Sequence, residues 1–309
     1  MTVCLPVGLE DLVSLSPEER GEVEELIAEC KSADGFDPCM HFDTHLNAEA
    51  GMPAWRLAWA ESSVGGSSGG RILVGAACVF APTRSEGEIS ACVSPVFRRQ
   101  GIFKSLYGGL ARTLSRAGVT SVMIVCEGTS PFGSAIAERL GAALDHGEYR
   151  MRLPADRLSG VSAPEGLRLL SVTPGASGEF AAISARVFGE PLRDATDFAG
   201  ATLADPSREL FVARATEGAV GVAAIARQGD AYEFFGLGVL SELRRRGLGG
   251  AILDACLVVL RKRGASAISL EVDAKNGPAL ALYRSRGFVE ESRADYWLLP
   301  VPGKPEDII

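Results

Sequence analysis

One string of residues occurs twice in this chain at a fixed spacing, and this repeat constrains the fold more than any other feature. Residues 93–103 (VSPVFRRQGIF) return as residues 239–249 (VLSELRRRGLG), and the two strings are 239 − 93 = 146 positions apart. The same spacing relates Gly118 to Gly264 further along the chain. A period of this length is that of a whole domain rather than of a short stacked repeat. We therefore interpret the chain as a duplication of one folding unit.

The length of the chain agrees with this interpretation. Domains commonly have about 100–150 residues, and a unit of that size can bury a core of its own. The chain has 309 residues. We predict a first domain at residues 1–158 and a second at residues 165–301, joined by the Gly- and Pro-containing segment 159–166.

Composition excludes several classes of function. The chain is 47% hydrophobic and 23% charged, without an apolar run long enough to span a membrane, and acidic residues stand where a signal peptide would carry basic ones. A net charge of −8 disfavours a nucleic-acid or anionic membrane partner, because either needs a basic surface. Seven cysteines, several in apolar segments, are typical of a reducing compartment. We expect a cytoplasmic protein that binds a small molecule.

One group of cysteine and histidine residues offers an alternative. Cys30, Cys39, His41 and His45 are residue types that bind zinc. The paired Cys-x2-Cys spacing of structural zinc sites is missing, and a loose polar segment explains the same residues. We expect no metal.

Each half is predicted to be a mixed α/β domain, with a mostly antiparallel twisted sheet flanked by helices. A capping box at Ser16–Glu19 opens a helix that extends to about Lys31. The predicted strands are apolar or β-branched segments bounded by turn residues, at 55–60, 72–80, 88–93, 121–125, 209–215, 219–227, 231–239 and 267–272. The Gly/Ser tract 62–70 is predicted to be a mobile hairpin loop.

An amphipathic helix follows each Arg-Gly string, and a second helix in each half ends at Gly141 or Gly287. In the second half the first of these helices starts at once after Gly247 and Gly249. The first N–H groups of a helix have no internal partners, and the helix dipole adds positive character, so this loop suits a diphosphate. Glycine leaves room for the phosphates and permits the tight turn. Arg244, Arg245 and Arg246 are expected to add positive charge.

At these residues the second half resembles the GNAT (Gcn5-related N-acetyltransferase) family. The family motif Arg/Gln-x-x-Gly-x-Gly/Ala corresponds to residues 244–249, preceded by a strand that ends in Leu237-Gly238-Val239. A second family motif, N-x-x-A-x-x-x-Y-x-x-x-G-F, corresponds to residues 276–288. The resemblance covers about 167–300, and more faintly 55–154.

The resemblance implies acetyl-CoA as the donor, with its diphosphate on the loop from Arg244 to Gly250 and its pantetheine arm beside Leu237–Val239, between two diverging strands. The implied donor-binding residues are Leu237, Gly238, Val239, Arg244, Arg245, Arg246, Gly247, Leu248, Gly249, Gly250, Asn276 and Tyr283.

The chemistry needs a base for the amine and an acid for the departing thiolate. By its place in the motif, Tyr283 is the implied general acid, with a tyrosine that only packs the helix as the alternative. Asn276 is implied to touch the donor, and it could equally be a helix cap. Glu233 and Glu271, on the strands that flank the expected gap, are the candidates for the base, although both could be plain surface residues.

The first half lacks much of the second motif. The positions of Gly249, Asn276, Ala279, Tyr283 and Phe288 are filled there by Phe103, Ser130, Gly133, Ala137 and Ala142. We therefore expect this half to be a degenerate, non-catalytic domain that helps to complete the acceptor pocket.

The sequence predicts a tandem N-acetyltransferase that transfers an acetyl group from acetyl-CoA to an amine of a small acceptor, as a monomer or a homodimer. Two alternatives stay open. One is an enzyme similar to mycothiol synthase, whose acceptor would be a cysteinyl sugar. The other is a protein that binds acyl-CoA without catalysis.

Overall fold

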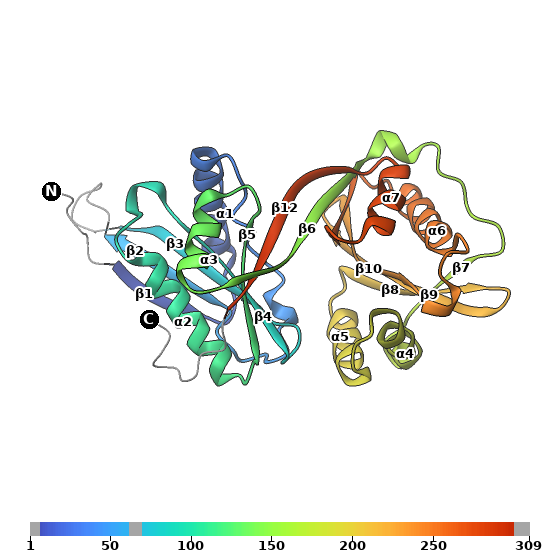
Figure 1. Ribbon diagram of the computed structural model, residues 1–309, viewed down its shortest axis with the longest axis horizontal. Helices are drawn as coiled ribbons and strands as arrows, with labels where there is room; N and C mark the ends of the chain where they lie inside the picture. The colour runs from blue at the N-terminus through green and yellow to red at the C-terminus, as the bar shows by residue number, and fades with distance from the viewer. Residues whose placement is uncertain (1–6, 62–69, 300–309) are drawn as a thin grey trace. The chain divides into compact units, whose positions relative to one another are not determined.

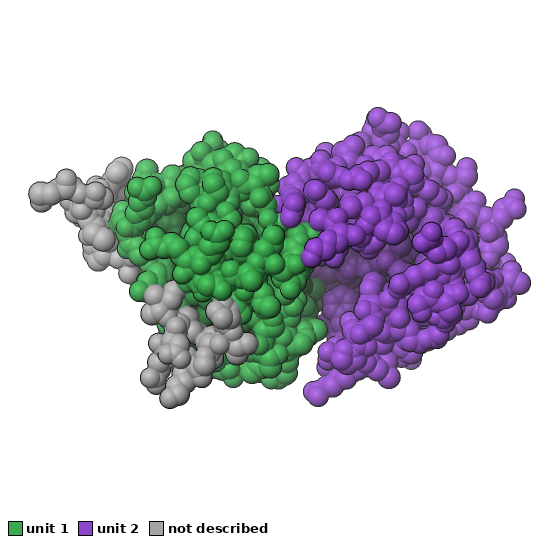
Figure 2. Space-filling model, viewed as in Figure 1, with its two compact units in different colours: residues 1–147, 294–309 green, residues 148–293 purple. Residues whose placement is uncertain are grey.

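A computed structural model describes residues 7–61 and 70–299 (Figure 1). The chain divides into two compact units, one of residues 1–147 with 294–309 and one of residues 148–293 (Figure 2). The predicted loop 62–70 lies almost wholly outside the described residues.

Within its described residues, the first unit contains a meander of four antiparallel strands and three α-helices. Its elements in chain order are β1 (Val7–Leu12), α1 (Pro17–Asp34), β2 (Trp55–Glu61), β3 (Arg71–Phe80), β4 (Glu86–Val93), α2 (Ile102–Arg116), β5 (Ser121–Glu127) and α3 (Pro131–Arg139). Strand β5 pairs in parallel with β4. The capping box is confirmed, because the Glu19 N–H donates to Ser16 Oγ and the Ser16 N–H donates to the Glu19 carboxylate.

The second unit repeats this order with two helices where the first has α1. Its elements are β7 (Arg168–Ser171), α4 (Ser177–Phe188), α5 (Leu192–Ala204), β8 (Arg208–Ala215), β9 (Gly218–Gln228), β10 (Ala231–Val239), α6 (Leu248–Lys262), β11 (Ala267–Asp273) and α7 (Gly277–Ser285). The predicted strands and helices are thus present in both halves, and the mixed α/β fold is confirmed. Strands β1 and β7, the last strand of each half, and helices α4 and α5 were not predicted.

The last strand of each half lies partly in the unit formed by the other half. Residues 148–154 of β6 (Ala143–Pro154) pair antiparallel with β11 in the second unit. Residues 294–298 of β12 (Val289–Leu298) pair antiparallel with β5 in the first unit. The units therefore differ from the predicted ranges 1–158 and 165–301, because the closing strands are exchanged.

Two apolar layers cover the sheet of the second unit and position the site. Helix α6 packs on one face, over a core that includes Tyr232, Phe234, Leu270 and the β6 residues Met151 and Leu153. The residues on the opposite face pack with α4 and α5, around Phe180, Ile183, Val187, Leu210 and Val222. Strand β6 is thus part of the core of this unit, since Met151 and Leu153 are fully buried.

The described residues contain neither a helix suited to span a membrane nor a cluster of metal-binding side chains. None of the helices among them has the length and apolar character needed to cross a membrane. Over residues 7–61 and 70–299, no three His, Cys, Asp or Glu side chains come together as a metal site would require. Of the four residues weighed for zinc, Cys30 donates to the carbonyl oxygen of Val93, and His41 lies 3.3 Å from the Glu88 carboxylate.

Candidate active site

The loop before α6 has the backbone of an anion site. Gly247 is the N-cap of α6 with φ of 78°, in the left-handed region that favours glycine, and it makes no side-chain cap hydrogen bond. Arg245 also has a positive φ, of 65°. The first turn of α6 therefore has N–H groups without helical partners or a capping side chain, which is the arrangement that binds phosphate.

The three arginines of this loop differ in their placement. Arg244 turns back from the loop, donating from Nε to the carbonyl oxygen of Val239 at 3.1 Å and from an Nη to that of Val187 at 2.9 Å. Val187 lies in the last turn of α4, where a cation is favourable. Arg245 and Arg246 are exposed. Arg244 thus ties the loop to α4, and the other two remain at the surface of the loop.

The strands that precede this loop diverge. Strands β10 and β11 pair in parallel only from Tyr232–Ile268 to Phe234–Leu270, although β10 continues to Val239. Beside the end of this pairing, the register between β10 and β9 shifts between Phe234 and Gly236. A bulge bends the strand that carries it. The pairing of β10 with β11 therefore ends before Leu237–Val239, where the sequence predicts that the strands diverge.

The two glycines of β10 have different surroundings. A Cβ at Gly238 would lie 2.1 Å from Val187 Cγ1, so helix α4 occupies the space where a side chain would be. A Cβ at Gly236 would meet only Ala224, at 3.5 Å. Helix packing thus explains why residue 238 is a glycine, whereas no helix fills the Cβ direction at Gly236.

Tyr283 is buried on the α6 side of the sheet. It lies in α7, packs edge-on against Phe288 with ring centroids 5.7 Å apart, and is 7% exposed. Burial raises the pKa of the Tyr283 hydroxyl to about 12. The hydroxyl is therefore protonated at neutral pH, as a proton donor must be. Asn276 caps the same helix, since its Oδ1 accepts from the Ala279 N–H at 3.2 Å.

The two candidate bases lie on the face opposite Tyr283. Their neighbours along each strand belong to the core under α6, so alternation turns Glu233 and Glu271 to the other face. Glu233 accepts from Gln228 Nε2 at 3.0 Å. Glu271 lies just beyond the point where β10 and β11 separate, 3.6 Å from an Nη of Arg150. The structure therefore brings the two glutamates to one face and places the tyrosine on the other.

Arg150 was not predicted to be near this site. It is the register partner of Glu271, on strand β6, and comes from the first half of the sequence. Arg150 lies beside Glu271 because β6 pairs with β11 in the second unit. No signal in the motif of the second half could have indicated it.

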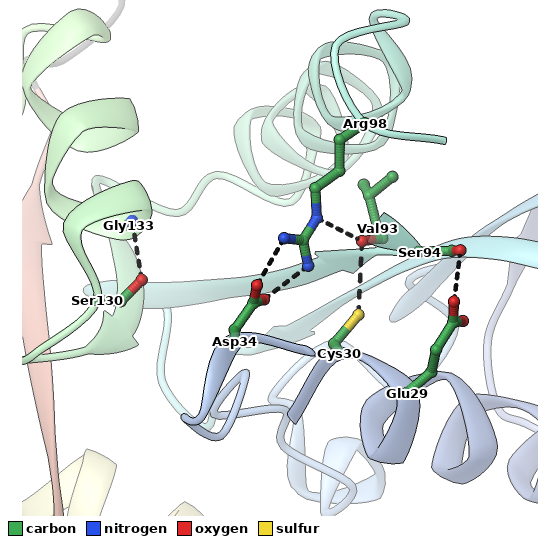
Figure 3. A network of polar contacts seen from close by, with 8 residues as sticks. All are labelled: Glu29, Cys30, Asp34, Val93, Ser94, Arg98, Ser130 and Gly133. Carbon is green, nitrogen blue, oxygen red and sulfur yellow. Dashed lines mark hydrogen bonds and ion pairs between the residues drawn. The ribbon is translucent and has the colours of Figure 1, made fainter. Parts of the chain in front are cut away.

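The corresponding loop of the first unit has the same backbone and a different chemistry. Gly101 and Arg99 have φ of 81° and 62°. Arg98 donates to the carbonyl oxygen of Val93 at 3.0 Å and pairs with both carboxylate oxygens of Asp34, at 2.7 and 2.6 Å (Figure 3). Asp34 thus neutralises the arginine, and the neighbouring Phe103 stands where the second unit has a glycine.

Comparisons with known proteins agree with this geometry. The sequence profile of the Acetyltransferase (GNAT) family matches residues 179–288. A mycothiol acetyltransferase of Clavibacter michiganensis subsp. michiganensis is 33% identical over 221 residues, which cover 66% of this chain and 70% of that protein. A mycothiol acetyltransferase of Salinispora arenicola is 30% identical over 306 residues, covering 90% of this chain and 92% of that protein.

Solved structures share the fold over nearly the whole chain. A GCN5-related N-acetyltransferase from Sphaerobacter thermophilus matches with a TM-score of 0.73 at 20% identity, covering 97% of this chain and 99% of that one. A tandem GNAT protein from the clavulanic acid biosynthesis pathway matches with a TM-score of 0.66 at 19% identity, covering 97% and 100%.

Proposed function

Because the chain belongs to the GNAT family of acetyltransferases, we propose that its second unit binds acetyl-CoA and transfers the acetyl group to an amine. The observation that carries the proposal is the first turn of α6, with its left-handed Gly247 and no side-chain cap. A diphosphate would accept hydrogen bonds from this turn. A Cβ at Gly249 would come no closer than 3.7 Å to its nearest neighbours, Leu282 and Val239, so the cradle is open at this position.

The bound donor supplies an activated acetyl thioester. The protein's part is to hold it with the thioester near the separated edges of β10 and β11, beside Leu237–Val239. The amine must lose a proton, and Glu271, at the point of separation, is the better placed of the two carboxylates for this task. Tyr283 has the proton that the departing thiolate needs. Glu271 thus takes up the proton of the amine on one face of the sheet, and Tyr283 gives its proton to the thiolate from the other face.

For the acceptor we propose the amine of a cysteinyl sugar. The support is the name shared by relatives that align with this chain over most of their length.

For the first unit we propose a supporting role without chemistry. Its loop arginine is neutralised by Asp34, and Ala137, which is fully buried, stands in the place of Tyr283. A buried methyl group can donate no proton.

The proposal is tested by incubating the full chain with acetyl-CoA and a cysteinyl amino-sugar glycoside, and by following the N-acetylated product by mass spectrometry. The matched control is the same glycoside with its cysteinyl amine already acetylated. Acetylation of simple amines but not of the cysteinyl sugar would overturn the proposed acceptor alone. Binding of acetyl-CoA without transfer to any amine would overturn the enzymatic proposal.

A further inference from the structure

A bidentate ion pair joins the two helices that carry the proposed donor loop and the proposed acid. Arg286, at the C-cap of α7, donates from Nε and Nη2 to the two carboxylate oxygens of Asp254 in α6, both at 3.0 Å. The two side chains are 30% and 25% exposed. A planar guanidinium that meets a carboxylate through two parallel bonds fixes orientation as well as distance. The pair therefore fixes how α7 lies on α6.

The guanidinium also lies against the first turn of α6. A Cβ at Gly250 would be 2.7 Å from Arg286 Nη2 and 3.6 Å from Leu282 Cδ1. A Cβ at Gly249 would be 3.7 Å from Leu282 Cδ2. Leu282 and Arg286 are one helical turn apart on α7, so this side of the helix rests on the two glycines. Gly250 thus leaves room for the Arg286 guanidinium in addition to any role with phosphate, whereas a Cβ at Gly249 would make only an ordinary contact with α7.

The first half of the chain has the same two helices without this contact. At a spacing of 146, the positions of Asp254 and Arg286 hold Gly108 and Leu140, and that of Gly250 holds Lys104. The fold itself can therefore be built without the ion pair. The pair occurs in the half that keeps Asn276 and Tyr283, which indicates a role in function.

We propose that the Asp254–Arg286 pair is a positioning element for acetyl transfer, which holds α7, and with it Tyr283, in a fixed place against the donor loop. This inference rests on the function proposed above. Tyr283 is three residues before Arg286, in the last turn of the same helix. A rotation or shift of α7 would move the hydroxyl away from the thiolate, and a misplacement of about 1 Å can cost about 100-fold in rate.

The test uses the full chain with Asp254→Asn, which keeps the volume and one acceptor, and Arg286→Leu, which installs the residue of the first half. The matched control is Arg284→Ala. Arg284 lies on the same helix and pairs with Glu290, away from α6. Hydrogen–deuterium exchange of residues 279–287 is measured without any ligand, and kcat and the KM for acetyl-CoA are measured with an acceptor that the parent acetylates.

We expect faster exchange of α7 and a fall in kcat of about tenfold or more in both variants, with the KM for acetyl-CoA within about threefold and Arg284→Ala close to the parent. In a Tyr283→Phe background, Asp254→Asn should lower kcat by less than about twofold, because the group that it positions is gone. Unchanged hydrogen–deuterium exchange of α7 in the two variants would overturn the inference. A fall in kcat of about tenfold or more from Asp254→Asn in the Tyr283→Phe background would also overturn it. So would a rise in the KM for acetyl-CoA at constant kcat. A parent that fails to bind acetyl-CoA would instead overturn the proposed function, and the exchange measurement would still decide whether the pair fixes α7.

Discussion

Arg244 donates from Nε to the carbonyl oxygen of Val239, five residues earlier, and Arg98 makes the same bond to Val93 in the other half of the chain. The duplicated arginines thus close the same loop in both units. They differ in what they do with their remaining N–H groups. Arg244 binds a main-chain carbonyl of α4, whereas Arg98 binds the carboxylate of Asp34 at the end of α1. In the first unit the charge of the loop arginine is therefore cancelled by an ion pair.

Gly247→Glu should abolish acetyl-CoA binding, because a side chain at a left-handed position is strained and its carboxylate repels phosphate. Calorimetry on the parent should find one site per chain. Gly101→Glu is the matched control, since it adds the same side chain at φ of 81° in the first unit. Two equal sites in the parent, or lost binding in the control alone, would contradict the assignment of the donor to the second unit.

Tyr283→Phe should lower kcat by about 10²- to 10⁴-fold, the usual contribution of a positioned acid. The affinity for acetyl-CoA should stay within a few-fold, because the hydroxyl acts mainly in the transition state. Tyr107→Phe is the control, as burial also raises the pKa of that tyrosine to about 12 and it lies in the first unit. A kcat within about threefold of the parent, with chemistry rate-limiting, would make Tyr283 a packing residue.

Arg98→Leu should leave turnover within a few-fold of the parent and lower the free energy of unfolding. The ion pair with Asp34 is only partly buried, so the loss should be about 1–3 kcal/mol, as for a hydrogen bond to a charged group. Denaturant unfolding followed beside steady-state kinetics checks both expectations. A tenfold fall in kcat with folding intact would show that the first unit takes part in the chemistry.

A chain that starts at Glu165 should be insoluble, and a chain of residues 148–293 should fold and bind acetyl-CoA. The first lacks the strand that pairs with all of β11 from Ala267 to Asp273, together with the buried Met151 and Leu153. Burial of each such side chain contributes about 1.5–3 kcal/mol. Circular dichroism and calorimetry of the two fragments decide the matter. A folded, active chain from Glu165 would show that β6 is dispensable.

The alkaline titration of the five tyrosines, followed by absorbance at 295 nm, should show a late phase, and Tyr283→Phe should remove part of it. The pKa of Tyr283 is raised by burial to about 12, above the usual value of 10.

Between pH 10 and 12 the folded state therefore holds a proton on Tyr283 that the unfolded state has lost. Stability should thus fall as pH rises through this range, by up to about 1.4 kcal/mol per pH unit for one such group. Tyr283→Phe should reduce that slope, and an unchanged slope would show that the hydroxyl is not buried in solution.

Much of this fold could be predicted because local patterns and the repeat agree. The capping box at Ser16, the glycine at the start of α2 and of α6 and the strand periodicity all follow from short-range chemistry. The exchange of β6 and β12 could not be predicted. The sequence is similar near the ends of both strands, MRLP at 151–154 and WLLP at 297–300, and nothing in either string distinguishes pairing with β5 from pairing with β11.

The sequence could indicate which residues form the candidate site better than it could indicate what those residues contact. Gly247 and Asn276 could be placed from spacing, because a helix start requires such residues locally. The partners of Arg244 and Arg286 are side chains and carbonyls of other helices, and they depend on how those helices pack. Arg150 reaches Glu271 only through the strand exchange.

The exchange of closing strands also sets the order in which the units can be completed on the ribosome. Strand β6 has been made before β11 appears, so the second unit has all of its residues once position 293 has been translated. The first unit begins earlier and must wait longer, because residues 294–298 of β12, the partner of β5, are synthesised after every residue of the second unit. Until then the edge of β5 lacks that partner, and an unpaired edge is a surface on which chains associate. The half that is translated first is therefore the one that finishes last.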